Sequence, residues 1–131
     1  MAPPPPPSIF FLGIMFLLMI HCAHGFEFNC LCNPDSFEAS DLRNLCVSNL
    51  LDALAGSIGH PPSYGDFYHQ VDCSGWPVYG HRWVDNLKPY ADNCLVQAKN
   101  VIKDSCAHRQ GADVSSGDTC RMRFELYDFR Y

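Results

Sequence analysis

Apolar residues recur at helical spacing between residues 37 and 58. Their stripe consists of Val47, Leu50, Leu51, Leu54 and Ile58, which is typical of a helix that buries one face. Ser40 or Asp41 is placed to cap its start. Gly56 and Gly59, followed by two prolines, predict its end, because the residue before a proline avoids helical geometry.

A second stripe and an alternating run occupy the last third of the chain. The stripe consists of Leu95, Ala98, Val101 and Ile102 and predicts a helix that starts near Asp92. From Arg121 on, three apolar residues alternate with four polar ones: Met122, Phe124 and Leu126 with Arg121, Arg123, Glu125 and Tyr127. This alternation predicts a half-buried strand. Residues 115–118 (SSGD) predict a hairpin turn between it and a strand at 112–114.

Three further segments read as strands. Residues 26–33 form a short candidate edge strand, and the turn residues NPDS at 33–36 follow it. Residues 64–71 and 77–84 are aromatic, alternating and bounded by glycine or proline. The order of strand, helix, strands, helix, strands predicts an α+β fold of two layers, in which two helices pack on one antiparallel sheet.

The first 25 residues have the features of a secretory signal peptide. An unbroken apolar run from Ile9 to Ile20 is shorter than the roughly 20 residues that span a bilayer. The small residues Ala23 and Gly25 predict cleavage after Gly25. We therefore expect a secreted, soluble mature domain of residues 26–131 without membrane insertion.

The cysteines predict a disulfide framework. The chain has eight, and Cys22 leaves with the leader. The other seven are Cys30, Cys32, Cys46, Cys73, Cys94, Cys106 and Cys120. This density is typical of small secreted domains, and the odd number predicts a free thiol or a bridge between chains. The spacing Cys30-Leu31-Cys32 is not that of a zinc knuckle, so no metal site is expected.

Charge and residue context exclude several classes of function. The formal net charge is −5 and no basic run is present, which argues against nucleic-acid partners and anionic membranes. No cysteine has an activating neighbourhood, and the acidic residues are scattered. We therefore expect no enzyme activity, no catalytic residues and no cofactor.

The mature chain resembles a plant family of secreted cysteine-rich domains, known as ginkbilobin-like, stress-antifungal or salt-stress-response domains. The same domain forms the extracellular part of cysteine-rich receptor-like kinases and of plasmodesmata-located proteins. The resemblance rests on Cys32-Asn33, Asn49-Leu50-Leu51, Val78-Tyr79-Gly80, Cys94-Leu95 with Ala98, Cys106, Gly111-Ala112, Cys120, Arg123-Phe124-Glu125 and Tyr127-Asp128-Phe129. It implies two helices on a five-stranded antiparallel sheet.

The cysteine pattern departs from this family. The family has a cysteine, eight residues, a cysteine, two residues and a cysteine, and only the last is present, as Cys94. Ala91 takes the middle position, and Val84 or a neighbour takes the first. The resemblance implies the disulfides Cys32–Cys106 and Cys94–Cys120. Of the remaining cysteines we expect Cys46–Cys73, with Cys30 unpaired or intermolecular; Cys30–Cys46 is the rival pairing.

The resemblance also implies a sugar site. Some family members are similar to lectins that bind mannose through an asparagine, an arginine and a glutamate. Asn33 and Glu125 match two of these residues, but Asp113 stands at the arginine position. An amide and a carboxylate still offer a donor and acceptors to sugar hydroxyls. The competing interpretation is that Arg121 and Arg123 pair with Glu125 as ordinary surface ion pairs.

Two classes of function follow. One is a secreted carbohydrate-binding or antifungal defence protein of the apoplast, with a degraded mannose site. The other is a non-enzymatic extracellular protein-interaction or signalling module without glycan binding, for which a homodimer or an extracellular receptor is the expected partner. A third possibility is that the domain has lost its ligand.

Overall fold

The computed structural model describes residues 28–56, 65–85, 87–88 and 90–130. The predicted signal peptide and cleavage site lie outside the described residues. So do Phe26 of the first predicted strand and Ile58 and Gly59 of the first predicted helix.

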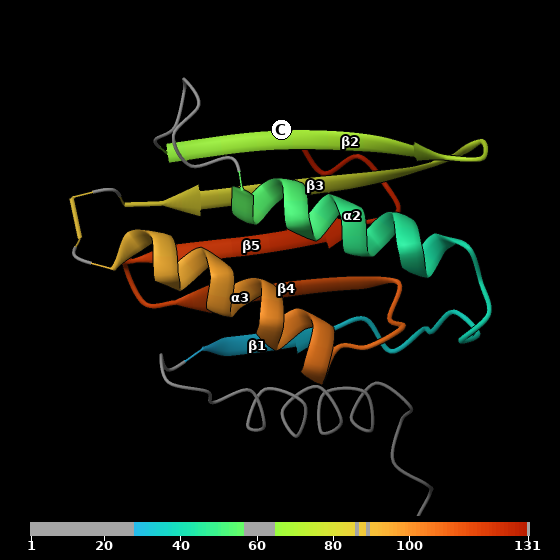
Figure 1. Cartoon of the computed structure of the whole chain (residues 1–131), viewed down its shortest axis with the longest axis horizontal. Coiled ribbons are helices and arrows are strands. Elements are labelled where there is room, and N and C mark those ends of the chain that lie inside the picture. The colour runs from blue at the N-terminus through green and yellow to red at the C-terminus, as the bar shows by residue number, and fades with distance from the viewer. Residues whose placement is uncertain (1–27, 57–64, 86, 89, 131) are drawn as a thin grey trace, which may run out of the picture.

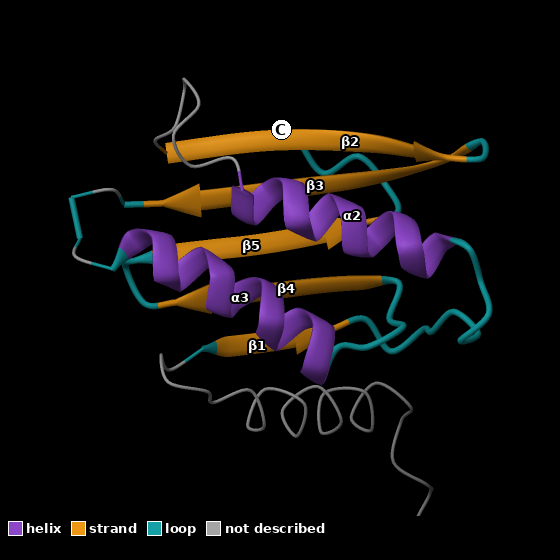
Figure 2. Cartoon of the chain, viewed as in Figure 1, coloured by secondary structure: helices purple, strands orange, loops and turns teal. Residues whose placement is uncertain are grey.

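Two helices pack on one face of a five-stranded sheet (Figure 2). The elements are β1 (Asn29–Cys32), α2 (Arg43–Gly56), β2 (Gly65–Cys73), β3 (Trp76–Val84), α3 (Ala91–Ser105), β4 (Gly111–Ser116) and β5 (Cys120–Glu125). The strand order is β1-β4-β5-β3-β2, and every neighbouring pair is antiparallel. The predicted α+β fold of two layers is thereby confirmed.

The core lies between the helices and the sheet. α2 covers β2 and β3, and α3 covers β4 and β5 (Figure 1). The predicted stripes face this core. From α2 come Leu50, Leu51 and Leu54, and from α3 come Leu95, Ala98, Val101 and Ile102, all at most 2% exposed. Val78, Val114, Met122 and Phe124 meet them from the sheet.

Gly80 lets α2 approach the sheet closely. A Cβ at Gly80 would lie 2.8 Å from Leu50 Cδ1 and 2.9 Å from Leu54 Cδ1. Such distances are below ordinary van der Waals contact, so both leucines would have to move within a packed core.

We therefore expect Gly80→Ala to lower the free energy of unfolding by about 1–3 kcal/mol, the usual cost of overpacking. Urea denaturation measures it. Gly56→Ala is the control, because nothing lies within 4 Å of the added Cβ at the end of α2 and alanine favours helix. An equal loss of stability in both variants would contradict the packing argument.

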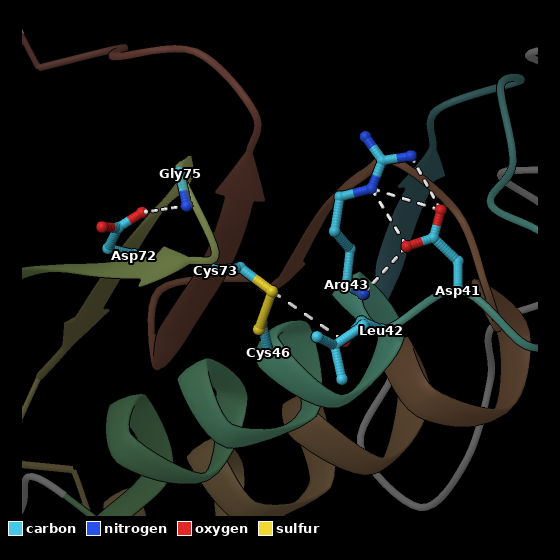
Figure 3. The surroundings of a disulfide bond; sticks show 7 residues. All are labelled: Asp41, Leu42, Arg43, Cys46, Asp72, Cys73 and Gly75. Carbon is cyan, nitrogen blue, oxygen red and sulfur yellow. Dashed lines mark hydrogen bonds and ion pairs between the residues drawn. A yellow bond between two sulfur atoms is a disulfide. The ribbon is translucent and has the colours of Figure 1, made fainter.

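Asp41, one of the two residues predicted to cap the first helix, lies two residues before its start at Arg43. The backbone N–H of Arg43 donates to Asp41 Oδ1 at 2.9 Å (Figure 3), which satisfies a helix-start donor. Phe37, in the preceding loop, is buried beneath the guanidinium of Arg43, which lies 4.6 Å from the centre of the Phe37 ring.

Two predicted boundaries are corrected. The hairpin turn is at residues 117–119 and not at 115–118, and Gly117 in it has a φ of 45°. The last strand ends at Glu125 and does not continue to Tyr127.

Three disulfide bonds between described residues fasten the helices to the sheet. Cys46–Cys73 joins α2 to the end of β2 (Figure 3), Cys94–Cys120 joins the start of α3 to β5, and Cys32–Cys106 joins β1 to the residue after α3. The structure thus forms the two bridges implied by the resemblance, and Cys46–Cys73 rather than Cys30–Cys46.

The prediction about Cys30 is corrected by the structure. Cys30 is disulfide-bonded in the whole chain, and none of the described cysteines is free. The prediction of an unpaired Cys30 is therefore wrong. The sulfurs of Cys30, Cys32 and Cys106 lie within 4.8 Å of one another, but each is in a disulfide and is not a thiolate ligand.

Candidate functional site in the sheet face without helices

The sheet face opposite the helices carries rows of polar and aromatic side chains. Cross-strand pairing places directly opposed residues on the same face. One row runs Leu31, Asp113, Arg123, His81 and Tyr68, and the next runs Gly111, Glu125, Tyr79 and Gln70. The charged residues of the last strand therefore face away from the core, as its alternation predicts.

The C-terminal residues cross this face. In Figure 1 the segment after β5 passes behind β3 toward β2. Phe129 is only 7% exposed, and the Arg123 guanidinium lies 4.3 Å from its ring centre. Arg130 Nη2 pairs with Asp128 Oδ2 at 2.8 Å, which lowers the pKa of Asp128 to about 2. The segment thus covers part of the sheet and leaves the β1 side open.

Asn33, Asp113 and Glu125 line one pocket on this open side, with a volume of about 270 Å³. We call it the sugar-site pocket. Its other lining residues are Leu31, Cys32, Pro34, Ala112, Arg123 and Tyr127. The fold therefore brings together all three residues that the resemblance singled out, from the end of β1, from β4 and from β5.

Asn33 is fixed at the end of β1. Its backbone N–H donates to the Gly111 carbonyl at 2.9 Å, and its side-chain Oδ1 accepts the Asp35 N–H at 2.8 Å. This local turn is the one that the sequence NPDS predicts. The amide NH₂ of Asn33 can donate to a ligand, because it carries the only N–H donors of this side chain.

Glu125 is the most enclosed acid of the pocket. Its side chain is 13% exposed, and Oε1 lies 3.3 Å from Arg123 Nε. A Cβ on Gly111 would collide with Glu125 Oε2, so the glycine makes the space for this carboxylate. Burial raises the pKa of Glu125; the Arg123 charge and hydrogen bond lower it, and the Asp113 charge raises it again.

Arg121 and Arg123 form ion pairs with different carboxylates. Arg121 donates to both oxygens of Asp113, with Nε 2.9 Å from Oδ1, a bidentate geometry. Arg123 pairs with Glu125 and also donates to the Tyr127 hydroxyl at 3.1 Å. The hypothesis that both pair with Glu125 is thus correct only for Arg123. A guanidinium nevertheless lies in the pocket although Asp113 stands at the arginine position.

The raised pKa of Glu125 predicts a pH effect on stability. The folded state holds this proton more tightly than the unfolded state, so the contribution of Glu125 is favourable below its ordinary pKa and is lost as pH rises through the raised value. Glu125→Gln does not titrate. We expect the wild type to gain stability relative to Glu125→Gln when the pH falls from 7 to 4. Urea denaturation of both proteins at each pH measures this difference, and a constant or opposite difference would contradict it.

Solved structures of other proteins share the fold of this chain. No protein-family model matches the chain, and no curated protein is significantly similar to it. Two crystal structures of tandem DUF26 ectodomains, from the Arabidopsis thaliana cysteine-rich receptor-like proteins PDLP5 and PDLP8, share the fold. For PDLP5 the TM-score is 0.65 at 16% identity, over 76% of this chain and 50% of that chain. For PDLP8 it is 0.65 at 18% identity, over 76% and 48%.

DUF26 is the domain of ginkbilobin-like plant cysteine-rich proteins. The fold that the resemblance implied is therefore confirmed, and at these identities the likeness concerns the fold alone. The chain spans about half the length of the two solved structures. Neither helix among the described residues is long and apolar enough to cross a membrane.

Proposed function

We propose that the chain is a secreted plant carbohydrate-binding protein whose sugar-site pocket takes a mannose-type sugar. The observation that carries this proposal is the convergence of Asn33, Asp113, Glu125 and Arg123 on one pocket. An amide, two carboxylates and a guanidinium supply donors and acceptors in the small space that a sugar with several hydroxyls needs. A role in antifungal defence would follow from binding mannose-rich surfaces.

In this proposal Arg123 replaces the arginine of the family pattern, whose position is occupied by Asp113. Its guanidinium comes from β5 instead of β4, and its hydrogen bonds to Glu125 and Tyr127 hold it at the pocket wall. Those bonds use two of its five N–H donors, so others remain for hydroxyl groups. The sugar site is then rearranged relative to the family pattern, and Asp113 is neutralised by Arg121.

Secretion is part of the proposal. Three disulfides in the described residues favour an oxidising compartment, and the leader predicts export to the apoplast. Sequencing the amino terminus of the protein recovered from the medium of cells that express the full chain tests this. A start at Phe26 supports it, and retention in the cytosol would contradict it.

Titration calorimetry of the secreted protein with mannose and mannan tests the pocket. Glu125→Ala and Arg123→Ala should each weaken binding about tenfold to hundredfold, because each removes a charge-assisted hydrogen bond. Glu38→Ala is the control, an exposed glutamate in the loop before α2, and should bind as the wild type does. Absence of binding in the wild type, or equal binding in all variants, would refute the proposal.

Asp113→Arg distinguishes a rearranged site from a degraded one. It restores the arginine of the family pattern but leaves Arg121 without its carboxylate and adds a third cation beside Arg123. If the Arg123 guanidinium already donates to the sugar, this variant should not strengthen sugar binding. Sugar binding that appears only in Asp113→Arg would mean that the native site has lost its ligand.

A second candidate function is a protein-interaction module, favoured by an apolar corner at the Cys46–Cys73 bridge. Leu42, Leu45 and Trp76 are 58%, 58% and 61% exposed there, and Arg43 lies over the Trp76 ring at 5.0 Å. Figure 3 shows Leu42 and Arg43 beside the disulfide. Because PDLP5 and PDLP8 carry tandem DUF26 ectodomains, the partner would be a second domain of this fold. Sedimentation that shows a dimer in the wild type and a monomer in Trp76→Ala would favour this candidate.

A further inference from the structure

We infer that the sugar-site pocket continues into a second sugar subsite around Trp83, so that the ligand is a neutral oligosaccharide rather than a single sugar. This inference rests on the proposed function of the pocket. It concerns a hollow on the same sheet face, which we call the Trp83 hollow.

The Trp83 hollow adjoins the pocket. Its volume is about 600 Å³, and Leu31 and Asp113 line both cavities. Sites for small organic ligands usually have about 300–1,000 Å³. The pocket alone is at the lower limit, whereas the hollow lies well inside this range. The shared wall therefore suits a ligand that fills the pocket with one ring and extends into the hollow with the next.

An aromatic surface faces the hollow between polar groups. Trp83 lies directly between Asp66 of β2 and Arg121 of β5 in the cross-strand register, and Ser115 continues the same row on β4. The indole is partly exposed and lines the hollow. The C–H face of a pyranose ring packs on an aromatic ring while its hydroxyls reach polar groups at the rim, a combination of apolar body and polar edge that fits this row.

The polar groups are held in place and retain bonding capacity. Asp66 Oδ1 lies 2.6 Å from His81 Nε2, and the Asp66 side chain is still 64% exposed. Arg121 spends two of its five N–H donors on Asp113. Fixed groups with free donors and acceptors bind hydroxyls at a low entropic cost.

The charged residues that line the hollow favour a neutral polysaccharide over an anionic one. Two carboxylates, Asp66 and Asp113, and one guanidinium, Arg121, line the hollow, so its acidic side chains outnumber its arginines. An anionic chain would be repelled, and Arg121 is already neutralised by Asp113. A neutral chain rich in hydroxyl groups is therefore the ligand that fits.

Calorimetric titration with mannose and with a linear mannotriose tests the inference. The wild type should bind mannotriose more tightly than mannose. Trp83→Ala should lower the affinity for mannotriose about tenfold, the effect of one lost aromatic contact, and leave the affinity for mannose unchanged. The control is Tyr90→Ala, which removes an exposed aromatic side chain outside both cavities and should change neither affinity.

The outcomes separate the subsite from the pocket. Equal affinity of the wild type for mannose and mannotriose, or an unchanged mannotriose affinity in Trp83→Ala, would overturn the second subsite and leave the pocket standing. Loss of mannose binding in a folded Trp83→Ala would also overturn it, because Trp83 would then belong to the pocket. No binding of either sugar by the wild type would overturn both proposals.

A second variant covers the case in which Trp83→Ala does not fold. Asp66→Ala removes an exposed carboxylate that lines the hollow but not the pocket. It should lower the affinity for mannotriose about threefold to tenfold, as expected for one hydrogen-bonding carboxylate, and leave mannose binding unchanged. Unchanged mannotriose binding in this variant would count against the subsite.

Discussion

Replacing both Cys32 and Cys106 by alanine should cost about 4.5 kcal/mol of stability, a large share of the 5–15 kcal/mol typical of a domain. Their disulfide spans 74 positions of sequence and joins the edge strand β1 to the end of α3. Without it the unfolded chain gains the entropy of a long open loop, and β1 loses its covalent link to the residue after α3.

Urea denaturation under oxidising conditions measures this loss. The control removes Cys46 and Cys73, whose separation is 27. For that shorter loop the same entropy argument gives about 3.5 kcal/mol. A smaller loss for the Cys32–Cys106 variant than for the control would show that loop entropy does not set the stability of this fold.

Phe124→Ala should lower the free energy of unfolding by about 3–5 kcal/mol, the usual cost of deleting a buried phenylalanine. Phe124 is fully buried at the centre of the sheet, with Gly80 and Ala112 opposite it on the flanking strands. Its ring fills the space that these small residues leave, and the rigid strands on both sides prevent collapse into the cavity.

Thermal or urea unfolding of Phe124→Ala beside Leu87→Ala checks this expectation. Leu87 is 87% exposed, so its truncation should change stability by less than about 0.5 kcal/mol. If the two variants lost similar stability, the assignment of Phe124 to the centre of the core would be wrong.

The sequence predicted the layers of the fold because each buried face repeats with the period of its element. Leu50, Leu51 and Leu54 lie at helical spacing, and Met122 and Phe124 alternate as strand residues do. The start of the first helix was left open between two capping residues, because Ser40 and Asp41 are both good caps. The structure uses Asp41, whose Oδ1 accepts the backbone N–H of Arg43.

The burial of Arg82 could not be predicted from the sequence pattern. The alternation of residues 77–84 predicts its strand, but no pattern rule predicts a fully buried arginine on the core face. Its Nη1 donates to the Gly65 carbonyl at 3.2 Å, and its guanidinium lies 5.3 Å from the Phe67 ring centre. Burial lowers the pKa of Arg82. These partners come from a neighbouring strand, so only the register reveals them.

The candidate site was predictable in part. The resemblance pointed to Asn33, Asp113 and Glu125, and the structure places them in one pocket. The choice of partner by each arginine was not predictable, because Asp113 lies directly opposite Arg123 in the register but pairs with Arg121, its diagonal neighbour. The alternation of the last strand did place Arg123 and Tyr127 on the face of Glu125, which was the available signal for both residues.

Mapping the sugar on the folded protein by NMR tests the central claim most directly. Titrating mannose into the isotope-labelled secreted protein should shift the amide signals of Asn33, Gly111, Asp113 and Glu125, and leave those of α2 unchanged. Shifts confined to the helix face or to the corner of Leu42, Leu45 and Trp76, or no shifts at high mannose concentration, would contradict a sugar site on the sheet face without helices.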